Sequence, residues 1–165
     1  MARRRDFSDW ATDNSAPLFR RALLLTGDWH RAEDLVQETL AKLYVSWARV
    51  DLDRNATGYA MRTLFHVFVS DRRRRPAEVA LVDVVPERPE PGRDLDLRLD
   101  LAKILAVLSP QERFVVVSRY LDDLSVEEVA RMLGRTRSWV RTTSHRALRR
   151  IQTAAPSPLT SSLLT

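Results

Sequence analysis

The sequence contains no cysteine, and it has only three histidines and four glycines among its 165 residues. Without cysteine, disulfides, thiol redox sensing and cysteine-ligated metals are excluded. Three histidines supply too few ligands to favour a zinc site, and the lack of a glycine-rich loop argues against a site that cradles nucleotide phosphates. We therefore expect neither a metal nor another cofactor.

Long hydrophobic runs are also missing. The chain begins with the basic stretch MARRRD, but no apolar segment of signal-peptide length follows, and none approaches the roughly 20 residues of a membrane span. We expect a cytoplasmic protein with no membrane insertion. Its length allows one or two small domains with modest cores.

Charge is abundant and divides the chain into three parts. The 27 Lys and Arg outnumber the 22 Asp and Glu, and the net charge of +5 favours an acidic partner such as nucleic acid. Residues 1–75 carry 14 basic and 10 acidic side chains (+4), residues 76–100 carry 3 and 7 (−4), and residues 101–165 carry 10 and 5 (+5). Four prolines lie in the acidic part. This pattern predicts an N-terminal domain at 1–75, a linker at 76–100, a C-terminal domain at 101–152 and a flexible tail at 153–165.

Apolar residues recur at helical spacing throughout both basic parts, which predicts an all-α fold of two small helical domains. In the first part we expect a short helix in residues 1–14, a helix opened by Ser15 and Pro17 that stops at Gly27, and a helix from Trp29 to about Trp47 with Asp28 as its cap. Residues 51–57 predict a polar loop, and Thr57 is expected to cap a helix that ends near Arg75. In the second part the helical pattern returns from Leu95, and Ser109 to Glu112 has the form of a helix start.

The stretch from Leu124 to Ile151 predicts a helix-turn-helix. Ser125 and Glu128 form an S-x-x-E capping box, and Gly134 is the residue type that most easily ends a helix in a left-handed conformation. Thr136 is a suitable N-cap for a second helix, whose apolar stripe contains Val140, Ala147, Leu148 and Ile151.

The opposite face of that second helix is basic. From Arg131 to Arg150 there are seven arginines and no acidic residue. One interpretation is a recognition helix in a DNA major groove, with its N-terminal residues on base edges and flanking arginines on phosphates. The alternative is an ordinary packing unit with a solvated charged face. The agreement of cap, turn, stripe and one-signed charge favours DNA recognition.

The order of these elements resembles a bacterial RNA polymerase sigma factor of the extracytoplasmic-function (ECF) type. AEDLVQETLAKLY (Ala32 to Tyr44) is similar to the family's helix that docks on the clamp helices of the polymerase largest subunit. GYAMRTLFHVFVSDRRRR is similar to its promoter-melting helix, and LSPQERF through SHRALRRI to its C-terminal domain, which reads the minus 35 element. The likeness covers roughly residues 15–151 in the family's order.

The resemblance assigns expected contacts to each part. On the helix after Asp28, an acidic face that could equally be ordinary solvated surface becomes the candidate site for core polymerase: Asp34, Gln37 and Glu38. The minus 10 element is assigned to the segment that captures a flipped base and to the promoter-melting helix: Asp53, Arg54, Asn55, Tyr59, Arg62, His66, Arg72, Arg73 and Arg74. For Arg72 to Arg75 an alternative is the ordinary preference of cations for a helix C-terminus.

The resemblance places the minus 35 contacts on the second helix of the helix-turn-helix and the turn before it: Arg135, Thr136, Arg137, Ser138, Arg141, Thr142, His145, Arg146 and Arg149. Three positions depart from the family's pattern. His66 and Ser70 stand where the promoter-melting helix usually has Asn and Asp, and Trp139 stands where a small residue or Thr is common. The family also implies an anti-sigma factor as a partner.

Two other functional classes are less consistent with the sequence. A conventional regulator would use the same helix-turn-helix on an operator, but it gives no reason for the likeness at Ala32 to Tyr44. For an enzyme, no nucleophile with a base, metal cluster or nucleotide loop can be assembled. The paired carboxylates Asp122-Asp123 and Glu127-Glu128 are explained by a helix boundary and its capping box, so we expect a protein that is not an enzyme.

Overall fold

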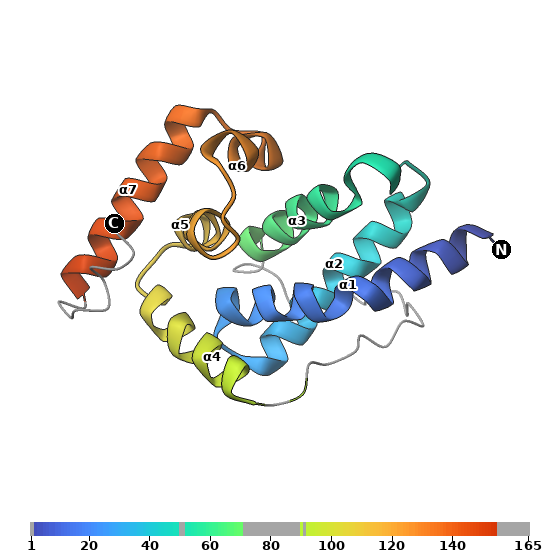
Figure 1. The fold of residues 1–165 in the computed structure, drawn as a ribbon, viewed down its shortest axis with the longest axis horizontal. Helices are drawn as coiled ribbons and strands as arrows, with labels where there is room; N and C mark the ends of the chain where they lie inside the picture. The colour runs from blue at the N-terminus through green and yellow to red at the C-terminus, as the bar shows by residue number, and fades with distance from the viewer. Residues whose placement is uncertain (1, 50–51, 71–89, 91, 155–165) are drawn as a thin grey trace.

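The computed structural model describes the backbone of residues 2–49, 52–70, 90 and 92–154, and side chains within 6–49, 56–70, 90 and 92–154. All regular structure in these ranges is helical, which confirms the all-α prediction (Figure 1). The elements are α1 (Ala2–Thr26), α2 (Trp29–Ser46), the short 3₁₀ helix η1 (Trp47–Arg49), α3 (Leu52–Ser70), α4 (Arg93–Leu105), α5 (Pro110–Val116), the π-helical turn η3 (Val117–Leu121), α6 (Val126–Leu133) and α7 (Arg137–Ala154). None of the helices in the described residues is long and apolar enough to cross a membrane.

Helix α1 is continuous, so the predicted break at Ser15 and Pro17 is wrong. Pro17 lies inside the helix, where it costs one backbone hydrogen bond and about 3 kcal/mol. The buried residues Phe7 and Ala11 before the proline and Leu18 after it share one stripe, and their packing outweighs that cost. Phe7 contacts the rings of both Tyr44 and Trp47, with centroids 5.2 and 5.1 Å away.

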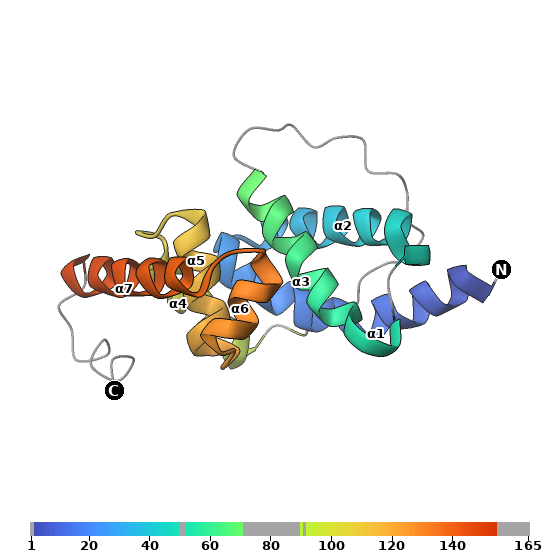
Figure 2. The same ribbon diagram turned by 90° about the horizontal axis from the view of Figure 1, so that it is seen from above.

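Helix α2 begins as predicted. The Asp28 side chain accepts a hydrogen bond from the backbone N–H of Arg31 at 2.8 Å, which satisfies one of the free donors at the helix start. Gly27 precedes it with φ +67°, a left-handed turn that reverses the chain between α1 and α2. The two helices then pack against each other along the buried stripe of α2 (Figure 2).

Helix α3 begins earlier than predicted. The segment expected to be a polar loop is helical from Leu52 onward, and Thr57 is not its cap but an exposed residue in its second turn. No glycine or proline interrupts residues 52–57, and Ala56 is buried like Ala60 one turn later. This polar segment is therefore part of the helix rather than a loop.

Helix α4 packs on α1, and it runs across the predicted boundary between linker and C-terminal domain at residue 100. Most of the predicted linker, like the predicted tail, lies outside the described residues. Helix α5 then starts at the Ser109–Glu112 capping box, in which the Ser109 N–H donates to Glu112 at 3.0 Å and the Glu112 N–H donates to Ser109 Oγ at 3.2 Å. The predicted helix start is confirmed.

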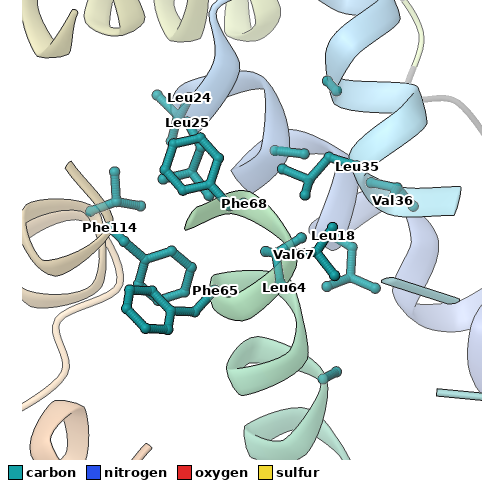
Figure 3. Packing of buried hydrophobic residues seen from close by; sticks show 14 of the residues in the cluster. Leu18, Leu24, Leu25, Leu35, Val36, Leu64, Phe65, Val67, Phe68 and Phe114 are labelled. Atoms are coloured by element: carbon teal, nitrogen blue, oxygen red, sulfur yellow. The ribbon is translucent and has the colours of Figure 1, made fainter. Parts of the chain in front are cut away.

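Both parts of the chain share one hydrophobic core. Phe65 of α3 and Phe114 of α5 meet edge to face, with ring centroids 4.9 Å apart and planes at 67° (Figure 3). The two rings are at most 2% exposed. Helix α3 therefore lies between α1 and α2 on one side and α5 and α6 on the other.

Candidate nucleic-acid interface

The helix-turn-helix is present as predicted. In its first helix, α6, the Ser125 N–H donates to Glu128 Oε2 at 2.6 Å and the Glu128 N–H donates to Ser125 Oγ at 3.1 Å. Gly134 ends α6 in the left-handed region at φ +63°. Thr136 Oγ1 then accepts from the Trp139 N–H at 3.0 Å and caps α7. Local capping chemistry thus fixes the angle at which α7 leaves the turn.

Helix α7 divides cleanly into a packed and a free face. Val140, Ala147 and Ile151 are buried, as the apolar stripe predicted, and Thr143 and Ser144 join them, whereas Leu148 of the predicted stripe is half-buried. Arg150 Nη1 also lies 3.5 Å from the buried carboxylate of Glu112, which ties α7 to α5. All nine residues assigned to the minus 35 element are exposed: Arg135, Thr136, Arg137, Ser138, Arg141, Thr142, His145, Arg146 and Arg149. The predicted recognition surface is therefore a single accessible, basic face.

Trp139 does not belong to that free face. The indole is partly buried against the hydrophobic core, and the Arg135 guanidinium lies over the ring at 5.0 Å from the centroid. The bulky residue at this position therefore supports the neighbouring arginine. Arg137 is also restrained, because its Nη1 lies 3.7 Å from Glu127 Oε1 on α6.

The acidic face of α2 brings its three candidate residues together. Asp34 is exposed, and Gln37 and Glu38 follow it at one-turn spacing on the side opposite the buried stripe. Lys42 pairs with Glu38 at 3.4 Å, an i, i+4 contact along the helix. Val45 continues the same side of the helix and is 82% exposed. Asp34 and Lys42 are exposed, whereas Gln37 and Glu38 are half-buried, so part of this face is accessible to a partner.

The residues assigned to the minus 10 element are described only in part. Tyr59, Arg62 and His66 lie on α3 and are exposed. Desolvation lowers the pKa of His66 below its usual value, and the positive charges of Arg62, Arg135 and Lys42 lower it further.

Asp53, Arg54 and Asn55 fall on the first turn of α3, where only the backbone is described, and Arg72, Arg73 and Arg74 lie outside the described residues. Two aromatic side chains lie near this segment, Trp47 in η1 and Tyr59 on α3. Trp47 is 3% exposed and belongs to the core, whereas Tyr59 is 40% exposed and therefore accessible.

A cavity of about 490 Å³ lies where α3 faces the helix-turn-helix. Tyr59 and Arg62 line it from α3, and Asp122 and Arg131 from the other side. Arg21 of α1 also reaches it and forms an ion pair with Asp122. The sequence interpretation assigned Asp122 to a helix boundary and did not single out Arg21, because no local pattern connects residues so far apart in the chain. Within the described ranges, no group of three or more His, Asp or Glu could hold a metal ion.

Both halves of the chain match known protein families. Residues 10–77 match the family described as Sigma-70 region 2, and residues 104–153 match Sigma-70, region 4. The RNA polymerase sigma-E factor of Streptomyces coelicolor is 33% identical over 152 residues, covering 89% of this chain and 84% of that protein. The ECF RNA polymerase sigma factor SigL of Mycobacterium tuberculosis is 32% identical over 151 residues, covering 85% and 83%.

A solved structure is also similar. The sigma factor RpoE of Bartonella quintana, crystallised in complex with the anti-sigma factor NepR, superimposes with a TM-score of 0.64 at 25% identity and covers 88% of this chain and 95% of that one. A conventional operator-binding regulator would account for the region 4 match but not for the region 2 match. The chain therefore belongs to the sigma-70 family and is an RNA polymerase sigma factor of the ECF type.

Proposed function

We propose that the protein is a dissociable initiation subunit that brings core RNA polymerase to a set of promoters. Helix α2 binds the polymerase through Asp34, Gln37 and Glu38. Helix α3 contacts and opens the minus 10 element, and α7 holds the minus 35 element. The protein works in the cytoplasm, and the polymerase supplies all catalysis.

The observation that carries the proposal is the geometry of α7. Its start is fixed by the Thr136 cap and the left-handed Gly134 before it, its inner face is packed, and its nine candidate contacts are all exposed. Such a helix presents arginines to base edges and phosphates without further rearrangement of its own domain. The polar face of α2, on which Asp34 is exposed and Gln37 and Glu38 are half-buried, supports a second, separate protein contact.

An anti-sigma factor is the further partner that we propose. The solved relative from Bartonella quintana was crystallised with one, and in this chain the α2 face and the α7 face are both accessible to a masking protein. Binding of such a partner would keep the protein from polymerase and promoter alike.

The test is run-off transcription by purified bacterial core polymerase on a library of promoter fragments, with and without the protein. We expect discrete start sites only when the protein is present. Asp34→Arg should abolish them because it reverses the charge on the proposed polymerase face. Asp9→Arg, the same change at an exposed position of α1, is the matched control and should leave them intact.

Two outcomes would contradict the proposed function. If no start sites appeared and the protein instead formed a tight complex with a DNA site in the absence of polymerase, the initiation role would be wrong. Equal loss with Asp34→Arg and Asp9→Arg would contradict the assignment of α2 to polymerase binding.

A further inference from the structure

The two halves of the chain are joined by a polar contact at the centre of their interface. Arg21 of α1 is 9% exposed, and its Nη2 forms an ion pair with Asp122 Oδ2 at the end of η3. Its Nη1 also donates to Ser118 Oγ at 3.5 Å, and the guanidinium carbon lies 6.0 Å from the centroid of the Phe114 ring. One arginine of the N-terminal half is thus held by three residues of the C-terminal half.

The backbone around Asp122 is shaped for this contact. The Asp122 N–H donates to Val117 O at 3.0 Å, five residues back, which makes η3 a π-helical turn. Asp123 then adopts φ +55°, outside the usual region for a residue other than glycine. This irregular turn brings Ser118 and Asp122 to the same side, facing Arg21.

The same packing brings residues that are proposed to contact the two promoter elements close together. The Arg62 Nη2 on α3 lies 3.6 Å from the point where a Cβ on Gly134, in the turn of the helix-turn-helix, would stand. Arg135, just after that turn, is close enough to influence the ionisation of His66 on α3. Residues assigned to the minus 10 element therefore lie beside residues assigned to the minus 35 element.

Binding to a promoter requires these two sets of residues to lie far apart. The minus 10 and minus 35 elements are about 25 base pairs apart by definition, or about 85 Å along B-form DNA at about 3.4 Å per base pair. DNA is stiff over such a distance, with a persistence length of about 150 base pairs. One closed molecule cannot reach both duplex elements, so the interface between the halves must open.

We propose that the Arg21–Asp122 ion pair is a latch that holds the free protein in a closed form in which it cannot engage both promoter elements. This inference rests on the proposed function for its consequence, but not for the existence of the latch. Opening separates α1 and α3 from α5, η3 and α6, and it transfers Arg21 and Asp122 from the interface to water.

A partly buried ion pair is suited to a reversible latch. Burial lowers the pKa of Arg21 and raises the pKa of Asp122, and the charge of each partner opposes that shift without outweighing it. When the interface opens, both charged side chains are hydrated again. When one partner is removed by mutation, the remaining charge has no counter-charge in the closed form, but it is still hydrated in the open form. A variant that neutralises Asp122 should therefore favour the open form.

The experiment measures the distance between the two halves in the full chain without polymerase or DNA. Because the native chain has no cysteine, Asp9→Cys on α1 and Gln152→Cys on α7 give two unique, exposed spin-label positions. We expect one narrow distance distribution for the otherwise unchanged chain. With Asp122→Asn we expect a broader second population and a rise of about tenfold in the ratio of open to closed molecules, because the buried Arg21 then loses its carboxylate partner, whose own side chain is 31% exposed.

Two controls isolate the ion pair. Asp123→Asn removes the same charge one residue further on, at a positive φ that Asn tolerates, and should stay closed. The double variant Arg21→Met with Asp122→Leu replaces the pair by apolar side chains and should also stay closed. Opening by Asp123→Asn, or an Asp122→Asn distribution equal to that of the parent chain, would overturn the proposal. Loss of helical circular dichroism in Asp122→Asn would overturn it as well, because the pair would then support the fold rather than a movable interface.

Run-off transcription separates the two proposals. If the latch is correct and the protein initiates transcription, Asp122→Asn should give more transcript than the parent chain at limiting protein. A distance change without any start sites would remove the initiation role and leave the latch standing. Start sites without a distance change would do the reverse.

Discussion

Phe65 and Phe114 join the two halves of the chain through an edge-to-face contact, with ring centroids 4.9 Å apart. Within the N-terminal half, Phe19 and Trp29 form a comparable pair at 4.7 Å and 61°. The first pair spans the interface that the latch would release, and the second does not.

Replacing Phe65 and Phe114 singly and together by Leu should therefore reveal a coupling of about 0.5–1.5 kcal/mol in the free energy of unfolding. Leu keeps an apolar side chain but removes the aromatic edge-to-face geometry. Chemical denaturation of the four variants measures the coupling. In an Asp122→Asn background the coupling of Phe65 and Phe114 should decrease, while that of Phe19 and Trp29 should be unchanged. Equal retention of both couplings would show that the halves remain docked.

Replacing Arg141 or Arg149 by alanine should impair DNA binding in different ways. Arg141→Ala, near the start of α7, should cost about 1–3 kcal/mol of binding and relax the preference at one base position. Arg149→Ala, two turns later, should weaken all sequences alike and lower the salt dependence by about one phosphate contact.

Competition binding of holoenzyme to promoter variants over a range of salt concentrations separates these two effects. Arg93→Ala, an exposed arginine at the start of α4, is the control and should change neither. Identical sequence profiles for the Arg141→Ala variant and the parent protein would show that this residue does not read a base.

Gly134 should be intolerant of a side chain. Its φ of +63° is a left-handed conformation, and a Cβ would meet only an ordinary contact with Arg62, so the cost arises from the backbone. Gly134→Ala should lower the free energy of unfolding by about 1–2 kcal/mol. Gly92→Ala, at an extended φ of 179° with no atom within 4 Å of the new Cβ, should be close to neutral in the same thermal melts. Similar losses at both sites would contradict the turn geometry.

The capping box of α6 should make the helix-turn-helix sensitive to acid. The Ser125 N–H and hydroxyl hold the pKa of Glu128 below its ordinary value of 4.5. The unfolded chain therefore binds this proton more readily than the folded one. The resulting stability is present above pH 4.5 and is lost as the pH falls through the lower pKa of the folded state.

Glu128→Gln should remove that dependence, because an amide does not titrate in this range. Thermal unfolding followed between pH 3 and 7 should show a shallower acid slope for Glu128→Gln than for the parent chain. Glu127→Gln, at the neighbouring exposed carboxylate outside the box, should keep the parent slope.

Signals carried by neighbouring residues were readable from the sequence. The two capping boxes, the Asp28 cap, the Gly134 turn and the stripe of α7 all depend on residues within one or two helical turns, and all are confirmed. The exposed basic face of α7 follows directly from that stripe, because burying one side of a helix leaves the other free.

Features that depend on tertiary packing could not be predicted from the sequence. The aromatic packing of Phe7 carries α1 through Pro17, although proline locally favours a break. Burial of Ala56 extends α3 into a polar segment. The Arg21–Asp122 pair joins positions about a hundred residues apart, and neither local sequence indicates which residue the other partner is.

The π-helical turn from Val117 to Leu121 also has a consequence for how the interface can change over generations. Such a turn holds one residue more than an α-helical turn would, and an α-helix advances about 100° per residue. Deleting one residue there would restore regular α-helix and rotate Asp122 by about that angle, away from Arg21. The loss or gain of a single codon is thus enough to break or form the Arg21–Asp122 ion pair, with the sequences of α2, α3 and α7 left unaltered.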